Sequence, residues 1–142
     1  MSDYMHSFEL FEPASLDDAA KLIGKFGKDG WIIAGGKDSL DWFKDRNKRP
    51  KAVINISNLK ELRGIKDNKD YISIGSVTTL TEMEDSKLLN KHFPILIDAV
   101  SRIASPQIRN AGTLGGNVSQ DTRCTYYRDG FPCYRAGGNT CY

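Results

Sequence analysis

A short apolar run that ends in two glycines limits the possible folds more than any other feature of this sequence. Trp31 to Ala34 is continuously apolar and is bounded by Gly30 and Gly35. A run of this length between glycines is typical of a strand buried inside a parallel sheet, and less typical of an exposed edge strand. Asp38 follows at a position where it can cap a short helix. The pattern therefore predicts a β-α-β unit with glycines at the turn from strand to helix.

Helix and strand signals continue on both sides of that run. Residues 8–11 alternate apolar and polar side chains and predict a short strand. Ser15 with Asp18 three residues later predicts a helix N-terminus, and Gly27 is placed to end that helix. Residues 52–56 predict the next strand. Strands that alternate with helices are typical of a mainly parallel sheet.

From residue 59 the pattern changes to strands joined by a tight turn. Residues 62–65 and 71–74 flank the sequence Asp-Asn-Lys-Asp at 67–70, which predicts an antiparallel hairpin. Thr79 and Glu82 have the spacing of a capping box at the start of a further helix.

A longer helix is predicted to begin at Pro94 and to end at Ser105-Pro106. We expect an α+β (mixed α/β) fold built of two small α/β subdomains, residues 1–58 and 59–120. Residues 121–142 have no clean periodicity and contain all of the cysteines, so they are expected to form a third, separate segment.

Composition places the chain among ordinary soluble domains. The 142 residues are 39% hydrophobic and 27% charged, with a formal net charge of +2. Nucleic-acid-binding proteins concentrate far more positive charge, so we expect no nucleic-acid partner. The longest apolar runs fall well short of the roughly 20 residues of a membrane-spanning helix, so no membrane span is expected. The start of the chain lacks a signal-peptide pattern, which predicts a cytoplasmic protein with reduced thiols.

The turn at Gly35 and Gly36 is suited to bind a phosphate. Glycines bring backbone N–H groups close to a ligand beside the positive end of a helix, and each charge-assisted hydrogen bond contributes roughly 1.5 to 3 kcal/mol. The surrounding sequence is neither a Walker pattern nor Gly-x-Gly-x-x-Gly. A tight strand-to-helix connection without a ligand explains the same pattern.

A second glycine-rich segment, residues 107–117, is the other candidate ligand loop. Its three glycines, with Asn110, Thr113 and Asn117, offer backbone donors and small polar groups suited to a pyrophosphate or a sugar chain. The alternative is a bulged turn between strands. Arg109 could neutralise a phosphate or could form an ordinary surface ion pair.

Cysteine and histidine are the remaining candidate ligands. Cys124, Cys133 and Cys141 fall in the last nineteen residues. Their spacing matches neither zinc ribbons nor ferredoxins, so spacing alone leaves free thiols, an iron–sulfur site and a zinc site open. His6 and His92 lie far from both glycine-rich segments in the sequence and are expected to have surface or packing roles, so no catalytic residue is predicted.

The two glycine-rich segments together resemble a known family. Ala34-Gly35-Gly36-x-Asp38 and the sequence from Ile108 to Asn117 are similar to the two flavin-dinucleotide-binding signatures in the medium subunit of molybdenum hydroxylases. That group includes xanthine dehydrogenase and carbon monoxide dehydrogenase. The order and separation of the signatures match, as does the opening Pro13-Ala14-Ser15-Leu16-x-x-Ala19. The resemblance therefore covers nearly the whole chain.

The C-terminal segment resembles one member of the family more closely. Asp121-Thr122-Arg123-Cys124-x-Tyr126-Tyr127, followed by two further cysteines, is similar to the insertion in the medium subunit of 4-hydroxybenzoyl-CoA reductase, which holds an additional [4Fe-4S] cluster. The resemblance implies that Cys124, Cys133 and Cys141 are cluster ligands. It also implies that the fourth cysteine, the rest of the FAD-binding domain and a C-terminal domain lie beyond Tyr142.

The resemblance implies FAD as the cofactor. The residues that would hold FAD or lie beside its flavin are Ile33, Ala34, Gly35, Gly36, Lys37, Asp38, Ser39, Leu40, Ile103, Ala104, Ile108, Gly112, Thr113, Gly116 and Asn117. Lys37 stands where the family commonly has threonine, which removes a hydroxyl donor and adds a cation that favours phosphate.

The implied function is that of an FAD-binding electron-transfer subunit, or of its N-terminal fragment. Such a subunit passes electrons between flavin and iron–sulfur centres. The implied partners are a large molybdopterin subunit, which carries the substrate site, and a small 2Fe-2S subunit. Two alternatives stay open at this point. One is a nucleotide-binding module without redox activity, whose cysteines are free or bind structural zinc, and the other is a fragment that folds but binds no cofactor.

Overall fold

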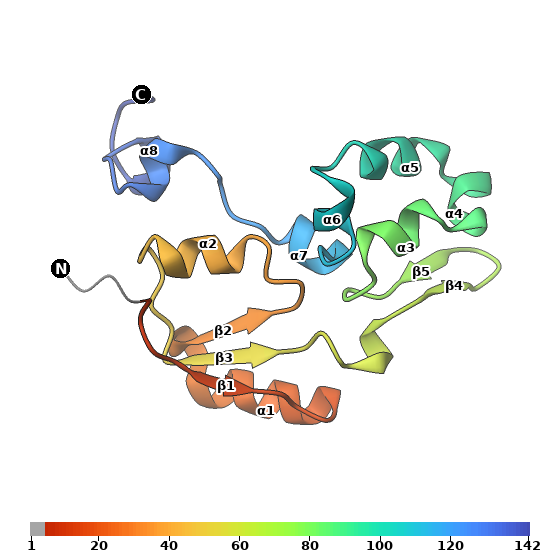
Figure 1. The fold of residues 1–142 in the computed structure, drawn as a ribbon, viewed down its shortest axis with the longest axis horizontal. Helices are drawn as coiled ribbons and strands as arrows, with labels where there is room; N and C mark the ends of the chain where they lie inside the picture. The colour runs from red at the N-terminus through yellow and green to blue at the C-terminus, as the bar shows by residue number, and fades with distance from the viewer. Residues whose placement is uncertain (1–4) are drawn as a thin grey trace.

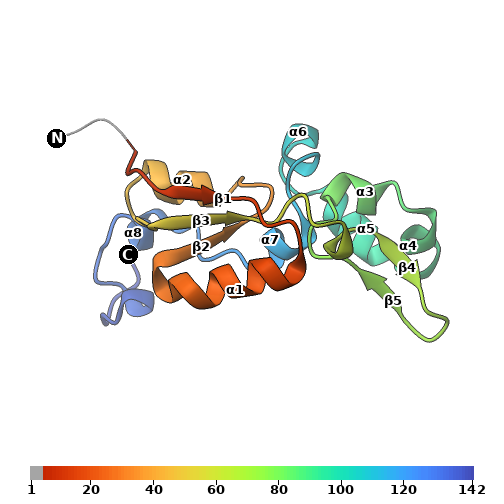
Figure 2. The same cartoon turned by 90° about the horizontal axis from the view of Figure 1, so that it is seen from below.

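The computed structural model describes residues 5–142, and its first part is a small parallel sheet with a helix on each face (Figure 1). The strands are β1 (Glu9–Phe11), β2 (Gly30–Ile33) and β3 (Ala52–Asn55), in the order β1-β3-β2. Helix α1 (Leu16–Phe26) covers one face and α2 (Ser39–Lys44) the other, as the turned view also shows (Figure 2). We call residues 8–56 the first lobe. The predicted β-α-β arrangement is confirmed.

Local sequence signals set the limits of α1. The Ser15 hydroxyl accepts a hydrogen bond from the Asp18 amide at 3.1 Å, which satisfies one of the free N–H groups of the first turn. Gly27 ends the helix with a φ of +48°, in a region that glycine enters without a side-chain clash. A short 3-10 turn, η1 (Gly27–Asp29), then leads into β2. Both predicted ends of this helix are confirmed.

The position of β2 in the sheet differs from the prediction. Because β3 pairs with both other strands, it is the central strand, and Ala52, Val53 and Ile54 are fully buried. Within residues 5–142, strand β2 pairs with β3 alone and therefore lies at the edge, where Ile32 is 48% exposed. The prediction that Trp31 to Ala34 form an inner strand is wrong, because an apolar edge strand that lines a cavity has the same sequence pattern.

Aromatic side chains fill the core on the α2 side of the sheet. Trp42, Phe43 and Val53 are buried there. The rings of Phe8 and Trp31 lie 5.7 and 5.6 Å from the ring of Phe43. Each such tilted or edge-on contact adds about 0.5–1.5 kcal/mol to the free energy from burial alone. This core fixes α2, and with it the turn that precedes α2.

A second lobe, residues 59–118, consists of a hairpin packed against short helices (Figure 1). Its elements are η2 (Lys60–Leu62), β4 (Ile65–Asp67), β5 (Ile72–Ile74), α3 (Leu80–Glu84), α4 (Lys87–His92), α5 (Pro94–Ser101), α6 (Pro106–Arg109) and α7 (Leu114–Val118). The core is formed by Leu80, Met83, Leu89 and Val100. The antiparallel hairpin is confirmed, although its first strand begins later than predicted because Leu62 belongs to η2. The predicted mixed α+β class is confirmed as well.

The helix signals of this lobe are partly confirmed. Thr79 and Glu82 form the predicted capping box, with each side chain bonded to the other residue's amide. Pro94 stands in the first turn of α5, also as predicted. The predicted end of that helix is wrong. Helix α5 stops at Ser101, and Ser105-Pro106 instead begins α6, with the Ser105 hydroxyl as the cap. Proline is as well suited to a first turn as to a position after a helix end.

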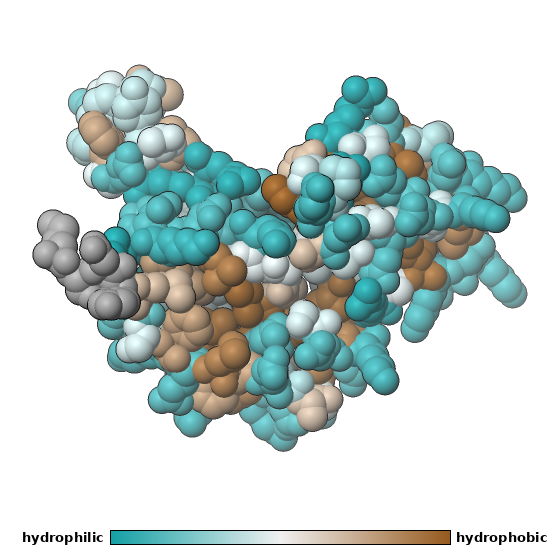
Figure 3. Space-filling model, viewed as in Figure 1, coloured by the Kyte–Doolittle hydropathy of each residue, from teal (hydrophilic) through white to brown (hydrophobic). Residues whose placement is uncertain are grey.

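The last segment, residues 121–142, returns to the first lobe and ends beside α2 (Figures 1 and 2). We call it the tail. It contains α8 (Thr125–Arg128) and η3 (Tyr134–Ala136). In the space-filling view the surface is indented between the tail and the second lobe, and apolar side chains gather over the sheet side of the first lobe (Figure 3). Among residues 5–142, no helix combines the length and the apolar character needed to cross a membrane.

Candidate functional site

The two glycine-rich segments touch through their backbones. A Cβ atom at Gly35 would lie 1.8 Å from the carbonyl oxygen of Ala111, so no residue with a side chain fits there without moving one of the segments. Gly36 has a φ of +69°, a left-handed conformation that costs other residues free energy. The turn after β2 therefore needs both glycines, one for close approach and one for its backbone conformation.

The second segment is anchored to the second lobe by backbone hydrogen bonds. The Leu80 amide donates to Gly112, and the Gly115 amide donates to Ser76, at 2.9 and 2.8 Å. The Thr113 hydroxyl caps α7 by accepting from the Gly116 amide at 3.2 Å. The segment is thus a turn between two short helices, α6 and α7. The alternative of a bulged turn between strands is wrong.

A cavity of about 580 Å³ lies where the two segments meet. Thirteen of the predicted cofactor residues line it: Ala34, Gly35, Gly36, Lys37, Asp38, Ser39, Ile103, Ala104, Ile108, Gly112, Thr113, Gly116 and Asn117. Ile33 and Leu40 do not. Their side chains lie behind the turn, within 3.3 and 3.6 Å of the position that a Cβ on Gly36 would take. These two residues shape the turn and do not face the cavity.

Nine further lining residues are not among the cofactor residues predicted from the sequence. They are Trp31, Ile32, Asp41, Trp42, Leu80, Ser119, Gln120, Asp121 and Arg123. Trp31 and Ile32 could have been found, because an edge strand that leads into a glycine turn faces the same space as the turn. The residues from Ser119 onward carry no periodic signal, and only the return of the tail to the first lobe brings them to the cavity.

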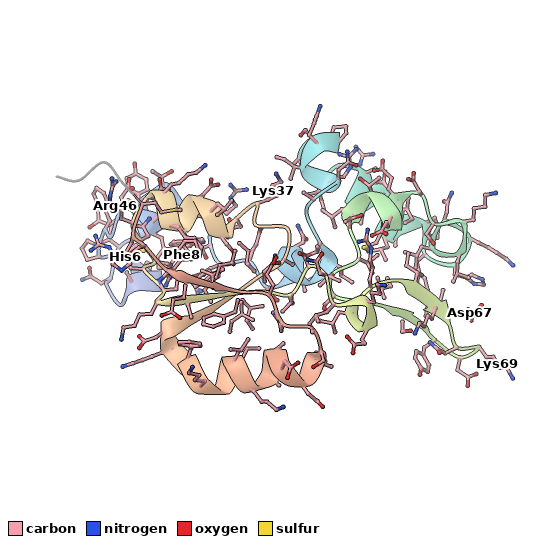
Figure 4. The ribbon with its side chains drawn as sticks, turned by 60° about the horizontal axis from the view of Figure 1, so that its bottom comes forward. His6, Phe8, Lys37, Arg46, Asp67 and Lys69 are labelled. Carbon is pink, nitrogen blue, oxygen red and sulfur yellow. The ribbon has the colours of Figure 1, made fainter. Side chains whose placement is uncertain are left out.

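The turn after β2 leaves backbone donors free. Among the residues that the structure describes, none accepts a hydrogen bond from the amides of Gly35, Gly36 or Lys37. The Lys37 side chain forms no ion pair within the described part of the chain, and Figure 4 shows this residue on the turn, on the side of the first lobe that faces the second. Consecutive free amides beside a lysine form a typical site for an anion.

The prediction that the Asp38 side chain caps α2 is wrong. Asp38 stands at the N-cap position, but its backbone is helical and its carboxylate makes no capping bond. The carboxylate instead accepts a hydrogen bond from the indole N–H of Trp42 at 3.0 Å and another from the Arg128 guanidinium at 2.8 Å. Asp38 therefore links the turn to the aromatic core and to the tail.

Arg109 does not face the cavity. Its guanidinium is buried and donates to the Glu84 carboxylate at 2.9 Å and to the carbonyl oxygen of Ile103 at 3.0 Å. Of the two alternatives for Arg109, the structure contains the ion pair, in which Arg109 is buried and Glu84 is 30% exposed. Beside it, Ala104 has a φ of +47°, an unusual conformation for a residue with a side chain. Arg109 thus fixes the backbone that brings Ile103 and Ala104 to the cavity.

Asp121 holds the start of the tail. Its carboxylate accepts from the Thr122 amide at 2.7 Å and from the Tyr127 hydroxyl at 3.1 Å, and it pairs with Arg135. The Thr122 amide, and after it the Arg135 guanidinium, hold the pKa of Asp121 below its ordinary value, against an opposing effect of burial. Asp121 is therefore ionised at neutral pH and keeps the tail folded onto itself.

Comparison with known proteins identifies the fold. Residues 6–138 match the family model of the FAD binding domain in molybdopterin dehydrogenase. The chain belongs to this family. The family resemblance expected from the two glycine-rich segments is thereby confirmed, and so is FAD as the cofactor of this type of domain.

Several relatives are subunits of dehydrogenases. The chain is 42% identical over 117 residues to the nicotinate dehydrogenase FAD-subunit of Eubacterium barkeri, which covers 81% of the chain and 39% of that protein. It is 36% identical over 112 residues to the carbon monoxide dehydrogenase medium chain of Hydrogenophaga pseudoflava, covering 79% of the chain and 39% of that protein. The chain spans about two fifths of the length of these relatives.

A solved structure supports the same assignment. The carbon monoxide dehydrogenase of Hydrogenophaga pseudoflava that lacks the Mo-pyranopterin moiety superposes with a TM-score of 0.79 at 35% identity. The match covers 81% of this chain and 40% of that one. The shared part is therefore the FAD-binding domain fold, present here in both lobes.

The described residues fit FAD. The cavity volume of about 580 Å³ is within the range of roughly 300–1,000 Å³ that is usual for small-molecule and cofactor sites. Free amides at Gly35, Gly36 and Lys37 suit the diphosphate, and the close contact of Gly35 with Ala111 keeps side chains out of the turn. The chemistry and the shape of the site thus agree with the family's cofactor.

The three cysteines of the tail are not arranged to bind a metal ion or a cluster together. Cys133 is buried, whereas Cys124 and Cys141 are exposed, and all three are free thiols. Within residues 5–142, no group of three or more His, Cys, Asp or Glu side chains is arranged to hold a metal ion. The predicted cluster ligands therefore do not fit a cluster in this arrangement.

Neither histidine lines the cavity. His6 lies near the start of the first lobe, away from Lys37 (Figure 4). His92 is the last residue of α4 in the second lobe. The two histidines are therefore not among the residues of the cavity wall.

Proposed function

We propose that this chain is the N-terminal part of an FAD-binding electron-transfer subunit of a molybdenum-containing hydroxylase or dehydrogenase. The observation that carries the proposal is the row of free amides at Gly35, Gly36 and Lys37, facing Thr113 and Asn117 across one cavity. Two backbone segments, one from each lobe, meet around this cavity. Such a site is suited to an extended dinucleotide and is larger than a site for a single phosphate.

Each side of the cavity has its own role in this proposal. The amides after β2 bind the diphosphate, while Thr113, Gly116 and Asn117 hold the same molecule from the second lobe. Ile103 and Ala104 provide an apolar wall beside the flavin ring and exclude water from it. FAD itself supplies the hydride and electron transfer, so the residues of this chain bind and orient it and are not required to move a proton.

We also propose the wider assembly. Two of the relatives are an FAD-subunit and a medium chain, which favours a complex with a large molybdopterin subunit and a small 2Fe-2S subunit. A cytoplasmic location accords with such a complex. Within the chain, residues 1–58, 59–120 and 121–142 serve as the two cofactor-binding subdomains and the cysteine-bearing segment.

A substitution at the backbone contact tests FAD binding. G35A places a Cβ where the Ala111 carbonyl oxygen lies, so we expect it to weaken FAD binding by about 100-fold or more, measured by quenching of flavin fluorescence. G24A is the matched control, because a Cβ at Gly24, on the exposed side of α1, meets nothing within 4 Å. G24A should bind FAD as the unchanged chain does and should be more stable by about 1 kcal/mol. Equal FAD affinity of G35A and the unchanged chain would contradict the proposal, and binding of ADP with no preference for FAD would favour a nucleotide-binding module.

For the tail, we propose the finer relationship to the 4-hydroxybenzoyl-CoA reductase type. Cys124, Cys133 and Cys141 would then bind a [4Fe-4S] cluster after the tail rearranges and a fourth ligand joins them from outside this chain. Anaerobic reconstitution with iron and sulfide should load the chain with little cluster, and a longer chain that supplies the fourth cysteine with about four irons. A longer chain that takes up one zinc and no iron would reject the cluster.

A further inference from the structure

The charged residues that line the cavity do not by themselves favour an anionic dinucleotide. Among residues 5–142, the cavity wall contains three acidic residues, Asp38, Asp41 and Asp121, and two basic ones, Lys37 and Arg123. The diphosphate of FAD carries two further negative charges. An uncompensated carboxylate near it opposes binding, because like charges at short range repel strongly in a partly desolvated site.

Arginines of the tail compensate each of these carboxylates. Arg128 donates to Asp38 at 2.8 Å. Arg123 pairs with Asp41 at 3.3 Å and also with Asp38 at 3.4 Å, and Arg135 pairs with Asp121. Arg128 and Arg135 do not line the cavity themselves, so they neutralise its wall from behind and leave Lys37 free for the ligand. The net charge around the cavity therefore depends on the arginines of the tail.

The pair of Arg128 and Asp38 is the most firmly built of these contacts. Its side chains are only 10% and 19% exposed, whereas Arg123 is 58% exposed. The Arg128 guanidinium stacks on the ring of Trp42 with 4.1 Å between its central carbon and the ring centroid. Trp42 in turn donates to the other oxygen of Asp38. Asp38 also has a weaker partner in Arg123, at 3.4 Å. Removing Arg128 therefore leaves the shielded Asp38 carboxylate with this exposed arginine alone, which compensates its charge less well than a buried, hydrogen-bonded partner.

We propose that Arg128 is a positioning residue for the dinucleotide. It cancels the charge of Asp38 and holds this residue against Trp42, so that the turn after β2 presents its amides and Lys37 to the diphosphate. Docking of the tail thereby becomes a condition for tight FAD binding. The inference rests on the proposed function, because it concerns the affinity of the same cavity for FAD.

A comparison of two flavins tests the inference in the 142-residue chain. R128M should weaken FAD binding by at least about tenfold, and should weaken riboflavin binding much less because riboflavin lacks the diphosphate. R102M is the matched control, since Arg102, the C-cap of α5, forms an exposed ion pair with Asp98 and does not line the cavity. R102M should leave the affinity for FAD unchanged.

A rescue separates charge compensation from a merely structural role. D38N removes the charge but keeps an oxygen that accepts from the Trp42 indole, so R128M combined with D38N should regain most of the lost affinity. The inference is overturned if R128M binds FAD as tightly as the unchanged chain, or if the double variant stays as weak as R128M. If the unchanged chain binds no FAD, these 142 residues are a fragment that does not hold the cofactor alone, and the inference fails for this chain.

Discussion

At the scale of single residues, Arg109 is the clearest example of a charge used to fix backbone beside the cavity. Its guanidinium joins Glu84 of α3 to the carbonyl of Ile103. Ala104 follows with its left-handed φ, a conformation that costs about 1 kcal/mol or more and persists only where neighbours enforce it. One buried arginine thus supports two residues that the FAD-binding proposal places beside the flavin.

We expect R109M to destabilise the chain by about 2–4 kcal/mol, because it leaves the Glu84 carboxylate and the Ile103 carbonyl without their partner. The measurement is the urea midpoint at pH 7. The double variant R109M with E84Q should recover part of the loss, since the uncompensated charge is removed. A single variant with the midpoint of the unchanged chain would show that the pair contributes little.

At the scale of elements, the sequence predicts most reliably where a helix or a turn has a local chemical cause. The cap at Ser15, the stop at Gly27 and the capping box at Thr79 all depend on side chains within a few residues of the backbone that they satisfy. The position of a strand in a sheet has no such local cause. Strand β2 lies at the edge because β3 pairs on both of its sides, which depends on residues about twenty positions away.

The cavity residues show the same difference between local and long-range causes. The glycines at 35, 36 and 112 are recognisable because close approach and unusual backbone angles leave a mark in the sequence. No local sequence pattern places Asp121 and Arg123 at the cavity, because they reach it only when the tail folds back onto α2. The same holds for Arg128, whose partner Asp38 is ninety positions away. Long-range ion pairs of this kind follow from tertiary structure alone.

At the scale of the whole molecule, the tail connects the site of the proposed cofactor with the cysteines. Tyr127 packs edge-on against Trp42, with the ring centroids 6.2 Å apart, and Asp121 binds both Tyr127 and Arg135 within the tail. The tail therefore lies on the first lobe through α8, and the internal bonds of Asp121 keep α8 and η3 together. A change that loosens Asp121 should loosen the whole tail.

Acid should produce that change at a defined pH. Because the folded tail lowers the pKa of Asp121, ionised Asp121 stabilises it. The contribution is complete above the unfolded value of 3.8 and is lost as the pH falls through the lower folded value. We expect the amide resonances of residues 125–128 to be unchanged between pH 7 and pH 5 and to shift below about pH 3.8. D121N should show the loosened tail already at pH 7, with no further step in acid at these residues. An acid step in D121N equal to that of the unchanged chain would assign the transition to another carboxylate and leave Asp121 without this role.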